Sequence, residues 1–86
     1  MDLDAMLTHY FGTSDLEQVD EAIFEAGRDR ALTQFGLERD GGRRFGLWVL
    51  LHAIGNAPDP GVAFEDPAER KAAEDYAWAA ERIGRA

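Results

Sequence analysis

The sequence predicts an all-α fold, and three observations carry this prediction. Apolar residues recur at intervals of three and four along three segments, which is the period of an amphipathic helix. Capping residues and glycines stand where such helices would begin and end. A further segment is almost wholly apolar, so a helix formed there must be enclosed by the others. We therefore expect one domain, residues 1–86, in which four helices (about 2–11, 15–35, 43–54 and 67–83) form a compact array around a buried central third helix.

The helix predicted at residues 2–11 has one apolar side and a clear end. Gly12 follows it, and glycine commonly ends helices because it adopts the left-handed conformation without strain. The apolar side consists of Leu3, Met6, Leu7, Tyr10 and Phe11. These residues would face the core together.

The helix predicted at residues 15–35 has a start signal in Ser14 and Glu17, which have the spacing of a capping box. Gly36 is expected to end it. Its apolar stripe shifts near Gly27. That shift indicates either a bend or two packing partners on successive halves of the helix.

Residues 43–54 are predicted to form a helix rather than a strand. The apolar run is longer than an ordinary strand and rich in leucine, which favours the helix. Asp40 is the expected N-cap, since aspartate accepts hydrogen bonds from the free N–H groups of a first turn.

The connection at residues 56–66 contains Pro58 and Pro60, so we expect no regular helix there. Val62 and Phe64 are the apolar residues expected to pin this connection onto the core.

The last predicted helix, residues 67–83, begins with Pro67 behind the N-cap Asp66. Its periodicity predicts an inner face made largely of small side chains, which permit close approach of another helix. The predicted inner face consists of Ala68, Ala72, Tyr76, Ala79, Ala80 and Ile83.

Charge excludes some classes of partner. The net charge is -8, and residues 1–27 carry seven acids and no base, so nucleic acids and anionic membranes would be repelled. The longest apolar run is shorter than the roughly 20 residues that a membrane-spanning helix needs. The acidic start, Met1-Asp2-Leu3-Asp4, is unlike a signal peptide, and we expect a cytoplasmic protein. Arginine outnumbers lysine eight to one and alanine is abundant, which suggests a bacterial origin.

A candidate anion site lies at Gly41, Gly42, Arg43 and Arg44. Two glycines at a helix start leave backbone N–H groups accessible, and two guanidinium groups follow them. The alternative is ordinary turn chemistry, with the arginines solvated or paired to acids. Asp20, for example, could reach an arginine such as Arg44 across a helix contact.

Two further features are candidate partner contacts. Trp78 falls on the polar side of its predicted helix, either exposed to a partner or covered by another segment. Glu17, Glu21 and Glu25 are spaced by four and would form one acidic row. This acidic segment, residues 15–25, is either a solvated face or a surface for a basic partner, including mimicry of a nucleic-acid backbone.

The two histidines, His9 and His52, have no neighbours at the spacing of a metal or acid–base site. We therefore expect no cofactor, no metal and no enzymatic activity. The expected function is protein–protein interaction or regulation, including self-association as a homodimer. The alternative is a regulatory domain that binds a small anion at the Gly41–Arg44 segment, and the third is acidic docking through residues 15–25.

Overall fold

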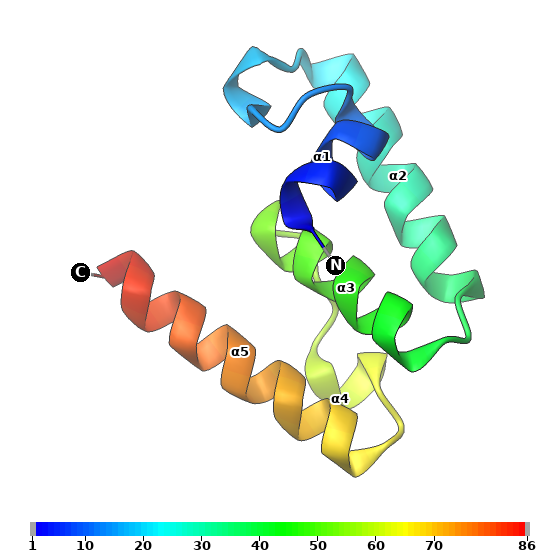
Figure 1. Ribbon diagram of the computed structural model, residues 1–86, viewed down its shortest axis with the longest axis vertical. Helices are drawn as coiled ribbons and strands as arrows, with labels where there is room; N and C mark the ends of the chain where they lie inside the picture. The colour runs from blue at the N-terminus through cyan, green and yellow to red at the C-terminus, as the bar shows by residue number, and fades with distance from the viewer. Residues whose placement is uncertain (1, 86) are drawn as a thin grey trace.

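The computed structural model describes residues 2–85, and it describes side chains through residue 82. The helices in chain order (Figure 1) are α1 (Leu3–Phe11), the short 3-10 helix η1 (Leu16–Gln18), α2 (Glu21–Leu37), α3 (Gly41–Ala53), the single-turn α4 (Pro60–Ala63) and α5 (Pro67–Arg85). Residues 2–85 contain no strand, so the predicted all-α class is confirmed. The predicted set of four helices was incomplete, because η1 and α4 are additional.

Helix α3 lies between α1 and α2 on one side and α4 and α5 on the other (Figure 1). Its Trp48, Leu50 and Leu51, together with Phe64, are the largest fully buried side chains. The indole Nε1 of Trp48 donates to the carbonyl oxygen of Pro58 at 2.9 Å, so the one polar group of this ring is satisfied. Helix α3 begins two residues earlier than predicted, directly after Asp40, which is the N-cap as predicted.

Helix α1 begins and ends at side chains suited to these positions. An Asp2 carboxylate oxygen accepts from the backbone N–H of Asp4 at 3.1 Å. Gly12 has a φ of 79° and donates its N–H to the carbonyl of Thr8 at 2.8 Å, so the predicted end is confirmed.

Helix α2 is continuous, and its two halves pack on different partners, which was one of the two expected alternatives. In the first half, Gly27 lies against the end of α1. A Cβ atom placed there would be 2.5 Å from the ring of Phe11 and 2.6 Å from the carbonyl oxygen of Tyr10. Arg30 Nη2 also donates to that carbonyl at 2.6 Å. In the second half, Phe35 is buried in the core beside α3.

The predicted start of this helix was wrong. Asp15 caps η1 by accepting from the N–H of Glu17 at 3.1 Å, and Asp20 caps α2 by accepting from the N–H of Ile23 at 2.9 Å. These two carboxylates compete with the backbone for its own N–H groups, which divides the predicted helix at Asp20. Ser14 makes no capping box, and α2 passes through Gly36 to end at Leu37.

The connection between α3 and α5 contains one helical turn, α4, which the two prolines were expected to prevent. Pro60 occupies its first position, where a missing N–H costs nothing. Phe64 is 1% exposed and pins the connection to the core as predicted. Val62 is 81% exposed, so that part of the prediction was wrong.

The predicted inner face of α5 is displaced by about one residue. Ala73 is fully buried and Ala77 half-buried, whereas Ala68, Ala72 and Ala79 are exposed. Of the other residues predicted there, Tyr76 is 36% exposed and Ala80 half-buried, while Ile83 lies outside the residues whose side chains are described. Two apolar stripes thus lie side by side on α5, and the chain itself buries only one of them.

The molecule is flat, with extents of 36 × 35 × 20 Å. Its accessible surface is 5747 Å², whereas a typical monomer of this mass exposes about 5,000 Å². A flat shape exposes more surface than a compact one of the same mass, which accounts for the direction of this difference. Within residues 2–85, no helix is long and apolar enough to cross a membrane.

Candidate functional site

An exposed apolar surface lies along α5 and the adjoining part of α3. We call it the α3–α5 face, and it consists of Leu3, Phe45, Val49, Ala72, Tyr76 and Ala79. None of these side chains carries a charge. Monomers rarely leave contiguous apolar surface open without a use for it, and such surfaces commonly mark a contact with another molecule.

Tyr76 joins the two halves of this face. Its ring lies edge-on to three rings of α3, with centroid distances of 6.5 Å to Phe45, 6.2 Å to Trp48 and 5.7 Å to His52. This edge-to-face geometry is favoured between aromatic rings and fixes Tyr76 to α3. The remaining third of the residue stays open to solvent.

A shallow groove of about 280 Å³ continues the face between α1 and α3. Leu3 and Met6 form one wall, and Phe45 and Val49 form the other. Gly46 lies between them, where the lack of a side chain deepens the groove. Helix α3 was expected to be enclosed, but its Phe45, Gly46 and Val49 are only half-buried. Phe45 lines this groove and also contacts Tyr76, so the half-buried part of α3 adjoins the exposed stripe of α5.

Trp78 is 61% exposed, which settles where this side chain lies. The guanidinium of Arg82 lies over its ring at 4.7 Å, a cation–π contact. Successive residues of an α-helix are rotated by about 100°, so Trp78 lies on roughly the opposite side of α5 from Tyr76. It is a second exposed aromatic, separate from the α3–α5 face, and its predicted role as a partner contact stays a prediction.

The predicted anion site has two of the chain's own carboxylates beside it. Asp40 accepts from the backbone N–H of Arg43 at 2.9 Å. A Cβ atom at Gly41 would be 2.7 Å from a carboxylate oxygen of Glu69, so this group also lies at the start of α3. The start of a helix favours a negative charge, and the carboxylates of Asp40 and Glu69 already supply it there.

Arg44 is half-buried and holds helix ends together. Its Nη1 donates to the carbonyl of Phe35 at 2.7 Å, and its Nη2 donates to the carbonyl of Ala63 at 2.6 Å. The guanidinium also lies 4.0 Å from the centroid of the Phe35 ring. The expected contact between Arg44 and Asp20 does not form, because both side chains are engaged at helix ends. Arg43 lines a cleft between α1, α2 and α3, whereas Arg44 lines a separate hollow beside α4.

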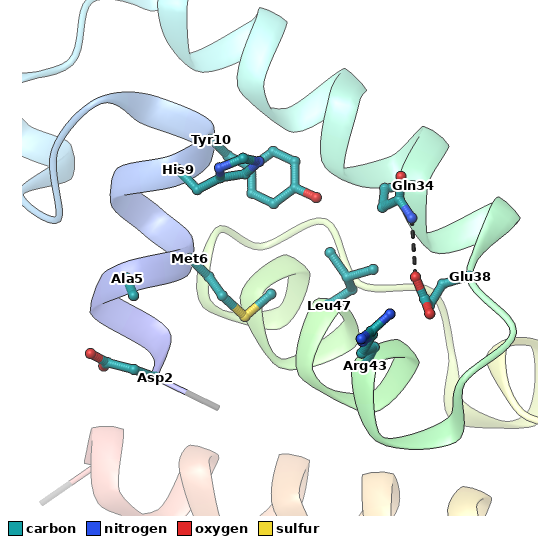
Figure 2. A pocket seen from close by; sticks show the side chains of 9 residues that line it. All are labelled: Asp2, Ala5, Met6, His9, Tyr10, Gln34, Glu38, Arg43 and Leu47. Carbon is teal, nitrogen blue, oxygen red and sulfur yellow. Dashed lines mark hydrogen bonds between the residues drawn. The ribbon is translucent and has the colours of Figure 1, made fainter.

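Figure 2 shows this cleft, which lies between α1, α2 and α3 and which we call the Arg43 cleft. It holds about 420 Å³, within the range of small-molecule sites. Met6, Ala5 and Leu47 supply apolar lining. Its polar lining consists of Asp2, His9, Tyr10, Gln34, Glu38 and Arg43.

Gln34 and Glu38 are hydrogen-bonded to each other, and Tyr10 is a hydrogen-bond donor at the cleft. Gln34 Nε2 donates to a carboxylate oxygen of Glu38 at 3.1 Å (Figure 2). Burial raises the pKa of Tyr10 above its ordinary value of 10.0. Arg30 acts against this rise, and Glu38 adds to it. The phenol of Tyr10 therefore keeps its proton at neutral pH.

The acidic residues 15–25 do not form the predicted single row. Glu17 belongs to η1 and Glu21 and Glu25 to α2, because Asp20 starts a new helix between them. All three glutamates are exposed. Docking of a basic partner through residues 15–25 stays a prediction.

The histidines lie apart. His9 is exposed on α1 beside Tyr10, and His52 is half-buried on α3 against Trp48 and Tyr76. Within the described residues, no three acidic, histidine or cysteine side chains are grouped as metal ligands. No protein-family model, curated protein or solved structure matches the chain.

The sequence singles out Trp78 and Arg43 as candidates, which stay predictions, but not the α3–α5 face. It placed Ala72, Tyr76 and Ala79 in the core, because their spacing is that of an inner face. The available signal was the neighbouring stripe, Ala73 and Ala77, which has the same period and equally small side chains. Periodicity alone does not decide which of two adjacent stripes the chain covers.

Proposed function

We propose that this protein has no chemistry of its own and works by binding another protein molecule through the α3–α5 face. The observation that carries this proposal is the second apolar stripe of α5, which stays exposed beside a half-buried α3. Removing apolar surface from water stabilises a complex by about 25 cal/mol per Å² before the costs of association. The exposed Trp78 offers a further contact on the other side of α5.

The test compares three forms of the protein immobilised on a solid support and exposed to an extract of source cells to which untagged chain has been added. The forms are the wild type, the pair Ala72→Arg and Ala79→Arg, and the control pair Ala22→Arg and Ala26→Arg. Ala22 and Ala26 are likewise exposed alanines of a long helix, and circular dichroism verifies that all three forms fold.

We expect the wild type and the control to retain a protein, either the added chain or another, and the first pair to retain none. A charged side chain in an apolar seam must lose its water without gaining a partner, which opposes binding. Retention of the same proteins by all three forms would contradict the proposal.

A second candidate function is binding of a small apolar carboxylate in the Arg43 cleft. Two donors, the guanidinium of Arg43 and the protonated phenol of Tyr10, lie at the same cleft as the apolar Met6 and Leu47. Arginine matches a carboxylate with two parallel hydrogen bonds. Binding of such a ligand would give this protein a regulatory role.

Thermal unfolding with and without millimolar benzoate, hexanoate or inorganic phosphate tests this candidate. We expect a carboxylate to raise the Tm of the wild type and of Arg39→Gln, but not of Arg43→Gln. Arg39 is an exposed arginine outside the cleft. An unchanged wild-type Tm, or equal shifts in all forms, argues against the site.

A further inference from the structure

We infer that the Arg43 cleft binds a free α-amino acid with an apolar side chain, whose carboxylate lies at Arg43 and whose ammonium group lies at Glu38. The inference rests on the second candidate function, the carboxylate site in this cleft, and adds a second charge to its ligand. Three observations carry it: a half-buried carboxylate without a cation, an arginine at the same cleft, and apolar lining beside both.

Glu38 is held at the cleft by uncharged groups. The residue is half-buried. Gln34 Nε2 donates to one of its carboxylate oxygens at 3.1 Å, and the backbone N–H of Asp40 donates to the other at 3.3 Å. These donors fix the carboxylate in place, but they are neutral and do not balance its charge. A carboxylate that has lost part of its water is stabilised by a cation close to it.

The position of Glu38 in the chain strengthens this preference for a cation. Glu38 is the C-cap of α2, where the helix dipole contributes negative potential. The other carboxylate of the cleft, Asp2, is at the start of α1 and accepts from the backbone N–H of Asp4 at 3.1 Å. The dipole of α1 stabilises the charge of Asp2 there. Glu38 is therefore the carboxylate of the cleft that favours an ammonium group.

Arg43 supplies the opposite charge from α3. It is exposed near the start of this helix and lines the same cleft. Figure 2 draws Arg43 and Glu38 at one end of the cleft. Among the side chains that the structure describes, neither forms an ion pair with the other or with any further residue. The cleft thus presents a positive and a negative group that one zwitterion can bridge.

A zwitterion fits these two groups better than a ligand with a single charge. A plain carboxylate would meet Arg43 but would be opposed by the charge of Glu38, and a plain amine would meet Glu38 but would be opposed by Arg43. An α-amino acid carries both charges on neighbouring atoms and gains both contacts. The protonated phenol of Tyr10 offers its carboxylate a further hydrogen bond.

The apolar lining of the cleft favours an apolar side chain on this amino acid. Ala5, Met6 and Leu47 line the cleft, and Figure 2 draws Leu47 between Met6 and Arg43. An aliphatic or aromatic side chain lying against them would be removed from water. The volume of about 420 Å³ suits a small molecule of this kind.

Isothermal titration calorimetry with three compounds that share one branched apolar chain tests the second charge. Leucine carries both charged groups, isocaproate lacks the ammonium group and isoamylamine lacks the carboxylate. We expect the wild type to bind leucine at least about tenfold more tightly than isocaproate, because leucine adds a charge-assisted hydrogen bond to Glu38. Isoamylamine should bind more weakly than leucine, since it leaves Arg43 without a partner.

Three variants test the assigned contacts, and circular dichroism verifies that each folds. Glu38→Gln keeps the size of the side chain but removes its charge, so it should raise the Kd of leucine about tenfold and leave that of isocaproate unchanged or lower. Arg43→Gln should weaken the binding of both compounds. Glu74→Gln removes the charge of an exposed acid outside the cleft and is the matched control, with both Kd values unchanged.

Equal affinities of the wild type for leucine and isocaproate would overturn the inference and leave the carboxylate candidate standing. Equal weakening of both compounds by Glu38→Gln would also overturn it, because Glu38 would then act on the shape of the cleft. Isoamylamine binding as tight as that of leucine would remove the role assigned to Arg43. If leucine does not bind, the inference fails, and if isocaproate, hexanoate and benzoate do not bind either, the carboxylate candidate fails with it.

Discussion

Gly27 lies where the end of α1 crosses α2, and its missing side chain sets the distance between these two helices. The nearest atoms to a Cβ placed there include the backbone carbonyl of Tyr10, which a rotamer change does not move. Gly36 lies on the same helix with nothing within 4 Å of its Cβ position. The pair therefore separates packing from intrinsic helix preference.

Gly27→Ala should destabilise the protein by about 1–3 kcal/mol, because overpacking outweighs the gain in helix preference. Gly36→Ala should stabilise it by about 0.5–1 kcal/mol, since alanine orders its backbone at lower entropic cost. Urea unfolding measures both. A stabilised Gly27→Ala variant would show that α1 does not pack as described.

Arg44 is the second residue whose role is clear from its contacts. It donates one hydrogen bond to the end of α2 and one to the end of α4. These carbonyls belong to last helical turns, where carbonyl groups lack partners within the helix.

Arg44→Met should lower the free energy of unfolding by about 2–3 kcal/mol, because it leaves two carbonyls without their charged donor. Arg44→Lys should restore only part of this loss, because lysine keeps the positive charge but its ammonium group lacks the planar fork of the guanidinium. Arg39→Met, at an exposed neighbouring arginine, is the control and should change stability by less than about 0.5 kcal/mol. Equal effects at both positions would refute a bridging role for Arg44.

At the scale of the helix, α2 shows where sequence patterns mislead. Ser14 and Glu17 have the spacing of a capping box, yet Asp15 and Asp20 cap the backbone at this point. Ser14, Asp15 and Asp20 all have side chains suited to an N-cap, and the pattern does not rank them. The outcome depends on where α2 must start in order to place Gly27 and Phe35 on their partners.

Asp20→Ala should therefore cost about 1 kcal/mol of stability, the usual value of a lost N-cap. Ser14→Ala should cost almost nothing, because α2 begins after Asp20 rather than at Ser14. Parallel urea titrations of the two variants measure the difference. A larger loss for Ser14→Ala would restore the longer helix predicted from the sequence.

Helix α5 shows a second limit of sequence patterns. Its existence and its start at Pro67 were predictable from the cap and the proline. Its buried face was not, because Ala72 and Ala73 begin two adjacent stripes of similar composition. The choice between them depends on the position of α3 and the connection, which is a property of the tertiary structure.

At the scale of the whole molecule, the all-α class and the Asp40 cap were predictable, because each has a local signal in the chain. The candidate site was only partly predictable. Trp78 and Arg43 stand out by residue type, whereas the α3–α5 face is assembled from α1, α3 and α5 and requires their relative placement. The flat shape and the large exposed surface likewise follow from packing alone.

Alanine methyl groups test the central claim most directly, since α5 buries one stripe within the chain and leaves the other exposed to a partner. NMR relaxation by a soluble paramagnetic reagent reports which methyls meet solvent. In the free protein, Ala73 should be protected while Ala72 and Ala79 are accessible. In complex with a protein retained from the extract, Ala72 and Ala79 should become protected. Ala72 and Ala79 methyls that stay accessible in that complex would contradict the proposed function, and an accessible Ala73 would contradict the fold.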